Sequence, residues 1–283
     1  MLDAGDAQWL CRSCRLNLTI PQLTVTGHVE RWATVEQAKR RLLYTLMGLG
    51  LTLKGKQDEG DTLGLGFRIL TPIDALEPVL TGHGDGVITL NLQEADDVHR
   101  EMTRVAIGEP WRTLLGHLRH EAAHYLHHRW ILGDSEAQDQ WRQAFGDERT
   151  DYGPALDRYH QQGPVPGWEA SHVSPYANAL PHEDWAETCA HLLLVIDAVE
   201  TAAARGLHRD SRAAHADPAS HRVPGLPTEE LLVTQWLPVA QFLNAMNRSL
   251  GLKDSYPFLL PEAVVQKMTV AACLLQRAAA QAA

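Results

Sequence analysis

The feature that most constrains this chain is a pair of histidines four residues apart, within a segment of helical periodicity at residues 114–130. His120 and His124 flank Glu121 in the pattern H-E-x-x-H, and no proline or glycine interrupts residues 117–130. Residues four apart on an α-helix lie about 40° apart around the axis and about 6 Å apart along it. Both imidazoles can therefore reach one metal ion, while the opposite, apolar face of the helix is buried.

The residue types in this pattern favour zinc. Zn²⁺ accepts neutral imidazole nitrogens in a tetrahedral site, and a water bound to it loses its proton near neutral pH. Glu121 follows the first histidine, where its carboxylate can take that proton as a general base. The alternative interpretation is a solvated, histidine-rich helix face, because His117 and His128 fall near the same side.

A catalytic zinc site commonly has three protein ligands and one open position, so a third ligand must come from elsewhere. Residues 182–204 are the best source, because Glu183 and Glu187 lie four apart on an otherwise apolar helix, where unpaired carboxylates are costly. We expect Glu183 to bind the metal and Glu187 to orient a ligand histidine, and the reverse assignment stays open. Glu148 is a further candidate ligand, unless each acid is only a favourable charge at a helix start. Tyr176 is a candidate donor to the developing oxyanion, with a packing role as its alternative.

Composition sets the broad class of protein. The 283 residues suffice for one large domain or two modest ones, and 45% hydrophobic with 21% charged residues is ordinary for a soluble globular protein. The formal net charge of −10 argues against a general nucleic-acid-binding surface. No apolar run reaches the length of a membrane span, and the N-terminus lacks the pattern of a signal peptide. We therefore expect a cytoplasmic protein without nucleic-acid or membrane partners, and the oligomeric state stays open.

The four cysteines include one close pair, Cys11 and Cys14, in a C-x-x-C pattern. Such a pair is half of a zinc knuckle, and the second half is missing, because Cys189 and Cys273 are isolated in apolar helical segments. We interpret the pair as a remnant or as thiols without a metal. A complete N-terminal metal site and redox chemistry are the alternatives. Without an export signal, the thiols are expected to be reduced.

Hydrophobic periodicity and Gly- and Pro-rich breaks predict a mostly helical α+β fold with a small β-sheet. Short strands are expected at residues 67–70 and 87–92, and the second strand is a candidate edge for binding a peptide as an added strand. Helices are expected at residues 35–49, 114–130, 135–145, 148–161, 182–204, 228–250 and 261–280, with loops at 55–66, 163–181 and 206–227.

Six stretches together resemble the bacterial zinc-binding metallopeptidase family. They are LCRSCRLNLTIPQL, VLTGHGDGVITLNLQEAD, GEPWRTLLGHLRHEAAHYLHHRW, FGDERTDYGPALDRYH, PHEDWAETCAHLLLVIDAVETA and NAMNRSLGLKDSYPFLL, and they span residues 10–260. The resemblance implies a zincin-like fold of the gluzincin type. It also implies zinc ligands at His120 and His124, a catalytic Glu121, and Glu183 as third ligand with Glu187 behind it.

The chain departs from the family pattern in two places. Family members usually begin with a fuller zinc ribbon, and they carry a larger residue where this chain has Ala122-Ala123. The resemblance therefore implies a truncated zinc-ribbon-like segment at residues 1–30 and a zincin-like metallopeptidase domain at residues 31–283. The implied function is zinc-dependent hydrolysis of a peptide or protein through a metal-activated water, with Glu121 as general base. The alternatives are a non-catalytic zinc-binding scaffold or binding protein, and a hydrolase of non-peptide amides.

Overall fold

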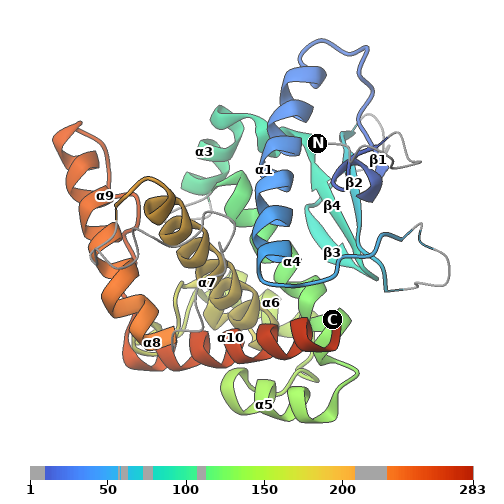
Figure 1. Cartoon of the computed structure of the whole chain (residues 1–283). Coiled ribbons are helices and arrows are strands. Elements are labelled where there is room, and N and C mark those ends of the chain that lie inside the picture. The colour runs from blue at the N-terminus through green and yellow to red at the C-terminus, as the bar shows by residue number, and fades with distance from the viewer. Residues whose placement is uncertain are drawn as a thin grey trace. The chain divides into compact units, whose positions relative to one another are not determined.

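The computed structural model describes residues 10–56, 58, 63–72, 79–106, 113–207 and 228–282 (Figure 1). The chain divides into two compact units. The first holds residues up to 47 together with 51–133, and the second holds residues 48–50 and 134–283. The elements make a mostly helical α+β fold with a small mixed sheet, which confirms the predicted class. The predicted organisation into residues 1–30 and 31–283 stays a prediction.

The first unit is built on a four-stranded sheet in the order β1-β2-β4-β3. Its strands are β1 (Asn17–Thr19), β2 (Gly66–Leu70), β3 (Gly82–Gly84) and β4 (Val87–Asn91). β1, β2 and β4 run parallel, and β3 runs antiparallel to β4. The predicted strand at 87–92 is therefore present as β4, but its expected role as a peptide-binding edge is wrong. β4 is paired on both sides, so β1 and β3 are the sheet edges among the described residues.

The turn between β3 and β4 is a two-residue hairpin loop. Asp85 and Gly86 have φ angles of 48° and 76°, the conformation of a type I′ turn, for which Asp-Gly is a favoured sequence. A Cβ atom on Gly86 would lie 2.5 Å from the carbonyl oxygen of Gly64, so no larger residue fits. This hairpin turns the chain back on itself and thereby places β3 at the edge of the sheet.

Among the described residues of the first unit, three α-helices accompany the sheet. They are α1 (His28–Gly48), α3 (Asp97–Ala106), and α4 (Leu114–Leu126), with a 3-10 turn η2 (Leu92–Ala95) before α3 and a π-helical turn η3 (His127–Ile131) after α4. Helix α1 begins seven residues before the predicted start at 35, because Arg31 already donates its backbone N–H to the carbonyl of Gly27. Its buried Lys39 pairs with Glu36 at 2.7 Å and lies 5.2 Å from the ring of Phe67 in β2. These contacts join α1 to the sheet.

Helix α4 begins at Leu114, after an N-cap at Thr113, and has a largely buried apolar side. The Thr113 side chain accepts a hydrogen bond from the backbone N–H of Gly116 at 2.9 Å, which caps the helix. Leu118, Ala122 and Tyr125 are fully buried, as the apolar stripe predicted. α4 packs against β3 and β4 of the sheet.

Among its described residues, the second unit contains helices joined by loops and no β-strand. Its elements are α5 (Ser135–Phe145), α6 (Tyr152–Gln162), η4 (Trp168–Ala170), η5 (Tyr176–Asn178), α7 (Pro181–Ala204), α8 (Thr228–Glu230), η7 (Leu231–Trp236), α9 (Leu237–Ser249) and α10 (Glu262–Ala282). Helix α7 contacts α5, η5, η7 and α10, and Figure 1 shows α10 crossing both α7 and α5. The buried Trp141 and Trp185 fill the core between α5 and α7.

The predicted helix at 228–250 is interrupted. Pro238 lies in the first turn of α9, where its missing N–H removes a backbone hydrogen bond to the preceding turn. The chain accommodates this as the π-helical segment η7 between α8 and α9. Most of the predicted loop at 206–227 lies outside the described residues. Among the helices that the structure describes, none combines the length and apolar character needed to cross a membrane.

Candidate metal centre

The two motif histidines come together on α4. Their Nε2 atoms are 3.2 Å apart, and their ring centroids are 4.9 Å apart with an interplanar angle of 75°. Two imidazole nitrogens bound at 2.0–2.1 Å to one tetrahedral zinc ion would be separated by about 3.3 Å. The spacing of the pair and its nitrogen donors therefore fit a shared zinc ion. His120 is buried, and His124 is partly exposed.

The candidate general base lies in a row with a histidine and a second glutamate of the first unit. Glu121 Oε1 lies 3.6 Å from Nε2 of His117, and Nδ1 of the same ring lies 3.6 Å from Oε2 of Glu94 in η2. These distances exceed a direct hydrogen bond. Glu94 and Glu121 are both buried, and the ring of His117 lies between their carboxylates. Sequence reasoning missed Glu94, because no local pattern connects it to the helix.

Strand β3 brings a further histidine beside α4. The His83 ring lies 6.1 Å from Tyr125 and 5.8 Å from His128, measured between ring centroids. The backbone N–H of Gly86 donates to its Nε2 at 3.2 Å, so the neutral ring carries its proton on Nδ1. Burial, with a smaller effect from the charge of His124, lowers the pKa of His83 to about 4. Sequence reasoning assigned His83 to a turn and gave it no role.

In the second unit, both candidate acids of α7 are held by hydroxyl groups. The phenol of Tyr152 donates to Oε1 of Glu183 at 2.7 Å, and the hydroxyl of Ser174 donates to Oε2 of Glu187 at 2.7 Å. Pro181 starts the helix, so Glu183 lies in its first turn, where the helix dipole favours an acid. A hydroxyl that fixes one carboxylate oxygen is an outer contact typical of a metal ligand. Tyr152 is a second residue that sequence reasoning missed.

A buried ion pair holds the same turn of α7 in place. Lys267 of α10 donates to Oδ2 of Asp184 at 2.5 Å and to the carbonyl of Ser171 at 2.8 Å. Burial raises the pKa of Asp184 to about 6, and the Lys267 charge opposes this increase. The pair joins α7, α10 and the preceding loop, and it thereby fixes the backbone next to Glu183.

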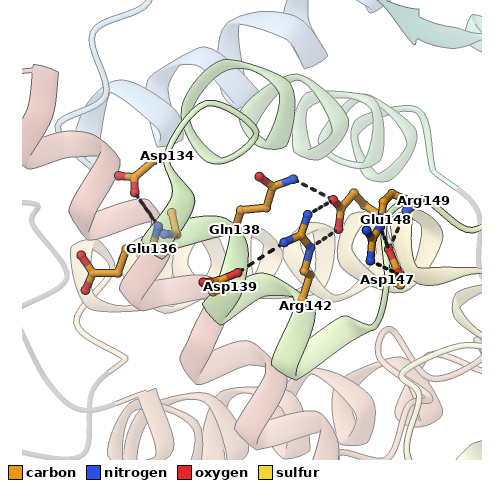
Figure 2. A network of polar contacts seen from close by, with 9 residues as sticks. Asp134, Glu136, Gln138, Asp139, Arg142, Asp147, Glu148 and Arg149 are labelled. Carbon is orange, nitrogen blue, oxygen red and sulfur yellow. Dashed lines mark hydrogen bonds and ion pairs between the residues drawn. The ribbon is translucent and has the colours of Figure 1, made fainter.

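Glu148, the alternative ligand, has a complete set of local partners. Arg142 donates its Nε to Oε2 at 2.7 Å and its Nη2 to Oε1, and Gln138 donates to Oε1 at 2.8 Å (Figure 2). The hydrogen bonds from Arg142 lower the pKa of Glu148 to about 2. These hydrogen bonds satisfy both oxygens of the carboxylate without a metal. They do not favour Glu148 as a metal ligand, and that role stays a prediction.

The predicted oxyanion donor, Tyr176, opens η5. Its ring packs edge-to-face on Tyr159 with centroids 5.6 Å apart, against a small core of Ala155, Ala179 and Leu180. These contacts match the packing interpretation, and a role in stabilising an oxyanion stays a prediction.

The C-x-x-C pair has two sulfur donors. Cys11 and Cys14 are free thiols with sulfur atoms 3.5 Å apart. Within the described part of the chain, no third His, Cys, Asp or Glu donor groups with them. A complete N-terminal metal site is therefore not assembled from the described residues.

Comparison with known proteins identifies the family of this chain. Residues 28–273 match the family described as "Putative zinc-binding metallo-peptidase", and the chain belongs to that family, as its sequence resemblance predicted. Similar proteins are Uncharacterized protein Mb2598c of Mycobacterium bovis, and Uncharacterized proteins MT2644 and Rv2568c of Mycobacterium tuberculosis. Each is 46% identical over 259 residues, which cover 92% of this chain and 74% of the relative. No solved structure matches the chain.

Proposed function

We propose that this protein is a zinc-dependent peptidase whose ion is held by His120 and His124 of α4 and Glu183 of α7. The observation that carries the proposal is the 3.2 Å spacing of the two Nε2 atoms, which suits two ligands of one tetrahedral ion. Membership in a family of zinc-binding metallopeptidases supports it. When bound, zinc supplies a Lewis acid that polarises the scissile carbonyl and makes a coordinated water more acidic.

Glu121 is the residue that moves the proton. Its carboxylate accepts a proton from the attacking water and then donates it to the leaving nitrogen, as general base and general acid in turn. His117 lies beside this carboxylate, and Glu94 lies on the other side of the His117 ring. The hydroxyl of Tyr152 orients Glu183, and Glu187 is proposed to act behind a ligand histidine.

A peptide or protein substrate is supported by the edge strand of the first unit. Among the described residues, β3 pairs with β4 alone, so one side of β3 can accept an extended peptide as an additional strand. α4 packs beside β3, so a peptide added there would run close to the histidine pair. A small non-peptide amide would make no use of this edge.

Zinc analysis and cleavage assays on matched variants test the proposal. Glu121→Gln should retain about one zinc per chain and lose at least about 100-fold in rate on a proteome-derived peptide mixture. His120→Ala should lose zinc and activity together. Glu136→Gln and His160→Ala, two exposed positions of the second unit, are the matched controls.

Two outcomes would contradict the proposal. Full activity of Glu121→Gln would remove the general base from the mechanism. Zinc bound by the wild type through His120, without cleavage of any peptide in the mixture, would favour a zinc-binding scaffold instead.

A further inference from the structure

The proposed third ligand lies at a helix start that has no side-chain cap. The residue before α7 is Leu180, whose side chain cannot accept a hydrogen bond from the first turn. The backbone N–H groups of Glu183 and Asp184 both donate to the carbonyl of Leu180, at 3.0 Å each. A helix end of this kind depends on contacts with other segments for its position. The orientation of Glu183 therefore depends on what holds the first turn of α7.

Lys267 of α10 contacts this turn directly. Its ammonium donates to Oδ2 of Asp184 at 2.5 Å, one residue after Glu183. The side chains are 14% and 3% exposed, so the solvent screens the pair only weakly. The other oxygen of Asp184 accepts from the hydroxyl of Thr188 at 3.4 Å, one turn further along α7. These contacts fix Asp184 and, with it, the backbone from which Glu183 projects.

The same ammonium also holds the loop that precedes α7. It donates a second hydrogen bond to the carbonyl of Ser171 at 2.8 Å. Three residues later, the hydroxyl of Ser174 donates to Oε2 of Glu187 at 2.7 Å. Lys267 therefore contacts α7 beside one candidate acid and the loop that orients the other. The arrangement serves the metal centre whether Glu183 or Glu187 is the third ligand.

Stability alone does not require a lysine at this place. Val264, Met268 and Ala271 of α10 are fully buried, and helical geometry puts Lys267 on the same side of the helix. An apolar side chain would continue this face. Replacing a buried ion pair with apolar groups of similar volume is often neutral or stabilising. The ion pair is therefore better explained by the single arrangement of α7 that it imposes than by added stability.

We propose that Lys267 is a positioning residue of the metal centre, which holds Asp184 and the loop at Ser171 and thereby orients the α7 carboxylate that binds zinc. The inference rests on the proposed function. Loss of an outer contact to a metal ligand lowers metal affinity about 10- to 100-fold. Lys267 acts one step further from the ligand, through the backbone, so its removal should weaken zinc binding by about 10-fold, the lower end of that range.

The zinc affinity of the full chain tests this role. Lys267→Met removes the ammonium. Asp184→Asn combined with Lys267→Met removes both charges, so that no buried carboxylate is left unpaired and able to unfold the helix. Arg277→Met is the matched control, because Arg277 lies on the same helix and pairs with Asp134 and Glu136 at the start of α5.

Zinc dissociation constants are measured by competition with a chromophoric chelator at neutral pH, and binding that persists in His120→Ala is subtracted. The single and the double variant at Lys267 should both bind zinc about 10-fold more weakly than the wild type. The double variant should still unfold at a urea concentration similar to that of the wild type. The visible absorption of bound Co²⁺, which depends on ligand geometry, should change in both variants and not in Arg277→Met.

Unchanged zinc affinity and Co²⁺ absorption in the double variant would overturn the positioning role. Equal weakening in Arg277→Met would also overturn it, because the effect would then follow from any damage to α10. If the double variant keeps its zinc while Glu183→Gln and His120→Ala lose theirs, this inference fails and the proposed function stands. If His120→Ala binds as much zinc as the wild type, the proposed function fails as well.

Discussion

The contacts of Glu148 predict that Glu148→Gln weakens the second unit and leaves zinc binding intact. The pKa of Glu148 is lowered from 4.5 to about 2 by Arg142. A shift of about 2.5 units corresponds to at most about 3.4 kcal/mol of stability at neutral pH. The side chain of Arg142 is 35% exposed, against 9% for Glu148, so solvent screening reduces the expected loss to about 1–2 kcal/mol.

The pairing of Glu148 with Arg142 also determines how the free energy of unfolding changes with pH. Because the folded-state pKa of Glu148 is depressed, its contribution is complete above about pH 5 and is lost as the pH falls from the unfolded value of 4.5 toward 2. The free energies of unfolding of wild type and Glu148→Gln should therefore differ at pH 7 and converge near pH 2. Urea unfolding at several pH values, with Arg142→Met and the double variant, measures the coupling energy directly.

Zinc content separates this structural role from a ligand role. Glu148→Gln should bind as much zinc as the wild type, whereas Glu183→Gln, the matched change at the proposed ligand, should bind far less. The reasoning is refuted if Glu148→Gln releases zinc, or if its effect on stability is below about 0.3 kcal/mol and does not change with pH.

Three further predictions follow from other contacts. His117→Asn should lower kcat about 10-fold at unchanged zinc content, because Glu121 loses the side chain beside it. Steady-state kinetics measures the effect, and an unchanged kcat would argue against a role of His117 beside the general base. Lys39→Met should cost about 3 kcal/mol in urea unfolding, because Glu36 loses its buried counter-charge, and a loss below about 1 kcal/mol would contradict that account. Burial raises the pKa of Cys189 to about 12, so this thiol should react with maleimides in urea but not in the native protein, as mass spectrometry of the labelled peptides can check.

The helix that carries the motif could be predicted from sequence because its determinants are local. The buried stripe through Leu118 and Ala122 and the spacing of His120 and His124 all lie within residues 118–124. Helical geometry then fixes which side chains share a face, whatever the rest of the chain does. The close approach of the two Nε2 atoms is the direct result.

The strands and interrupted helices were predicted less completely, because their form depends on pairing and on backbone hydrogen bonds. The alternating run at 87–92 indicates a strand, but alternation does not say which strands lie beside it. The short segment at 82–84 became the edge because the Asp85-Gly86 turn folds it back onto β4. The apolar periodicity of 228–250 is helical on both sides of Pro238, so periodicity alone did not reveal the π-helical segment before it.

By itself, the sequence determined the histidine pair on one face of α4, the presence of acids on α7 and the family to which the chain belongs. Tertiary structure decided which groups lie near the motif: Glu94, 27 residues before Glu121, approaches the His117 ring beside it, and His83 of a separate strand packs near Tyr125. It also decided that Glu148 accepts a hydrogen bond from Arg142 and Glu183 accepts one from Tyr152. The sequence alone does not distinguish the partners of these two acids. The physical reason is that the pKa and orientation of a carboxylate depend on the charges and donors that folding brings within a few ångströms.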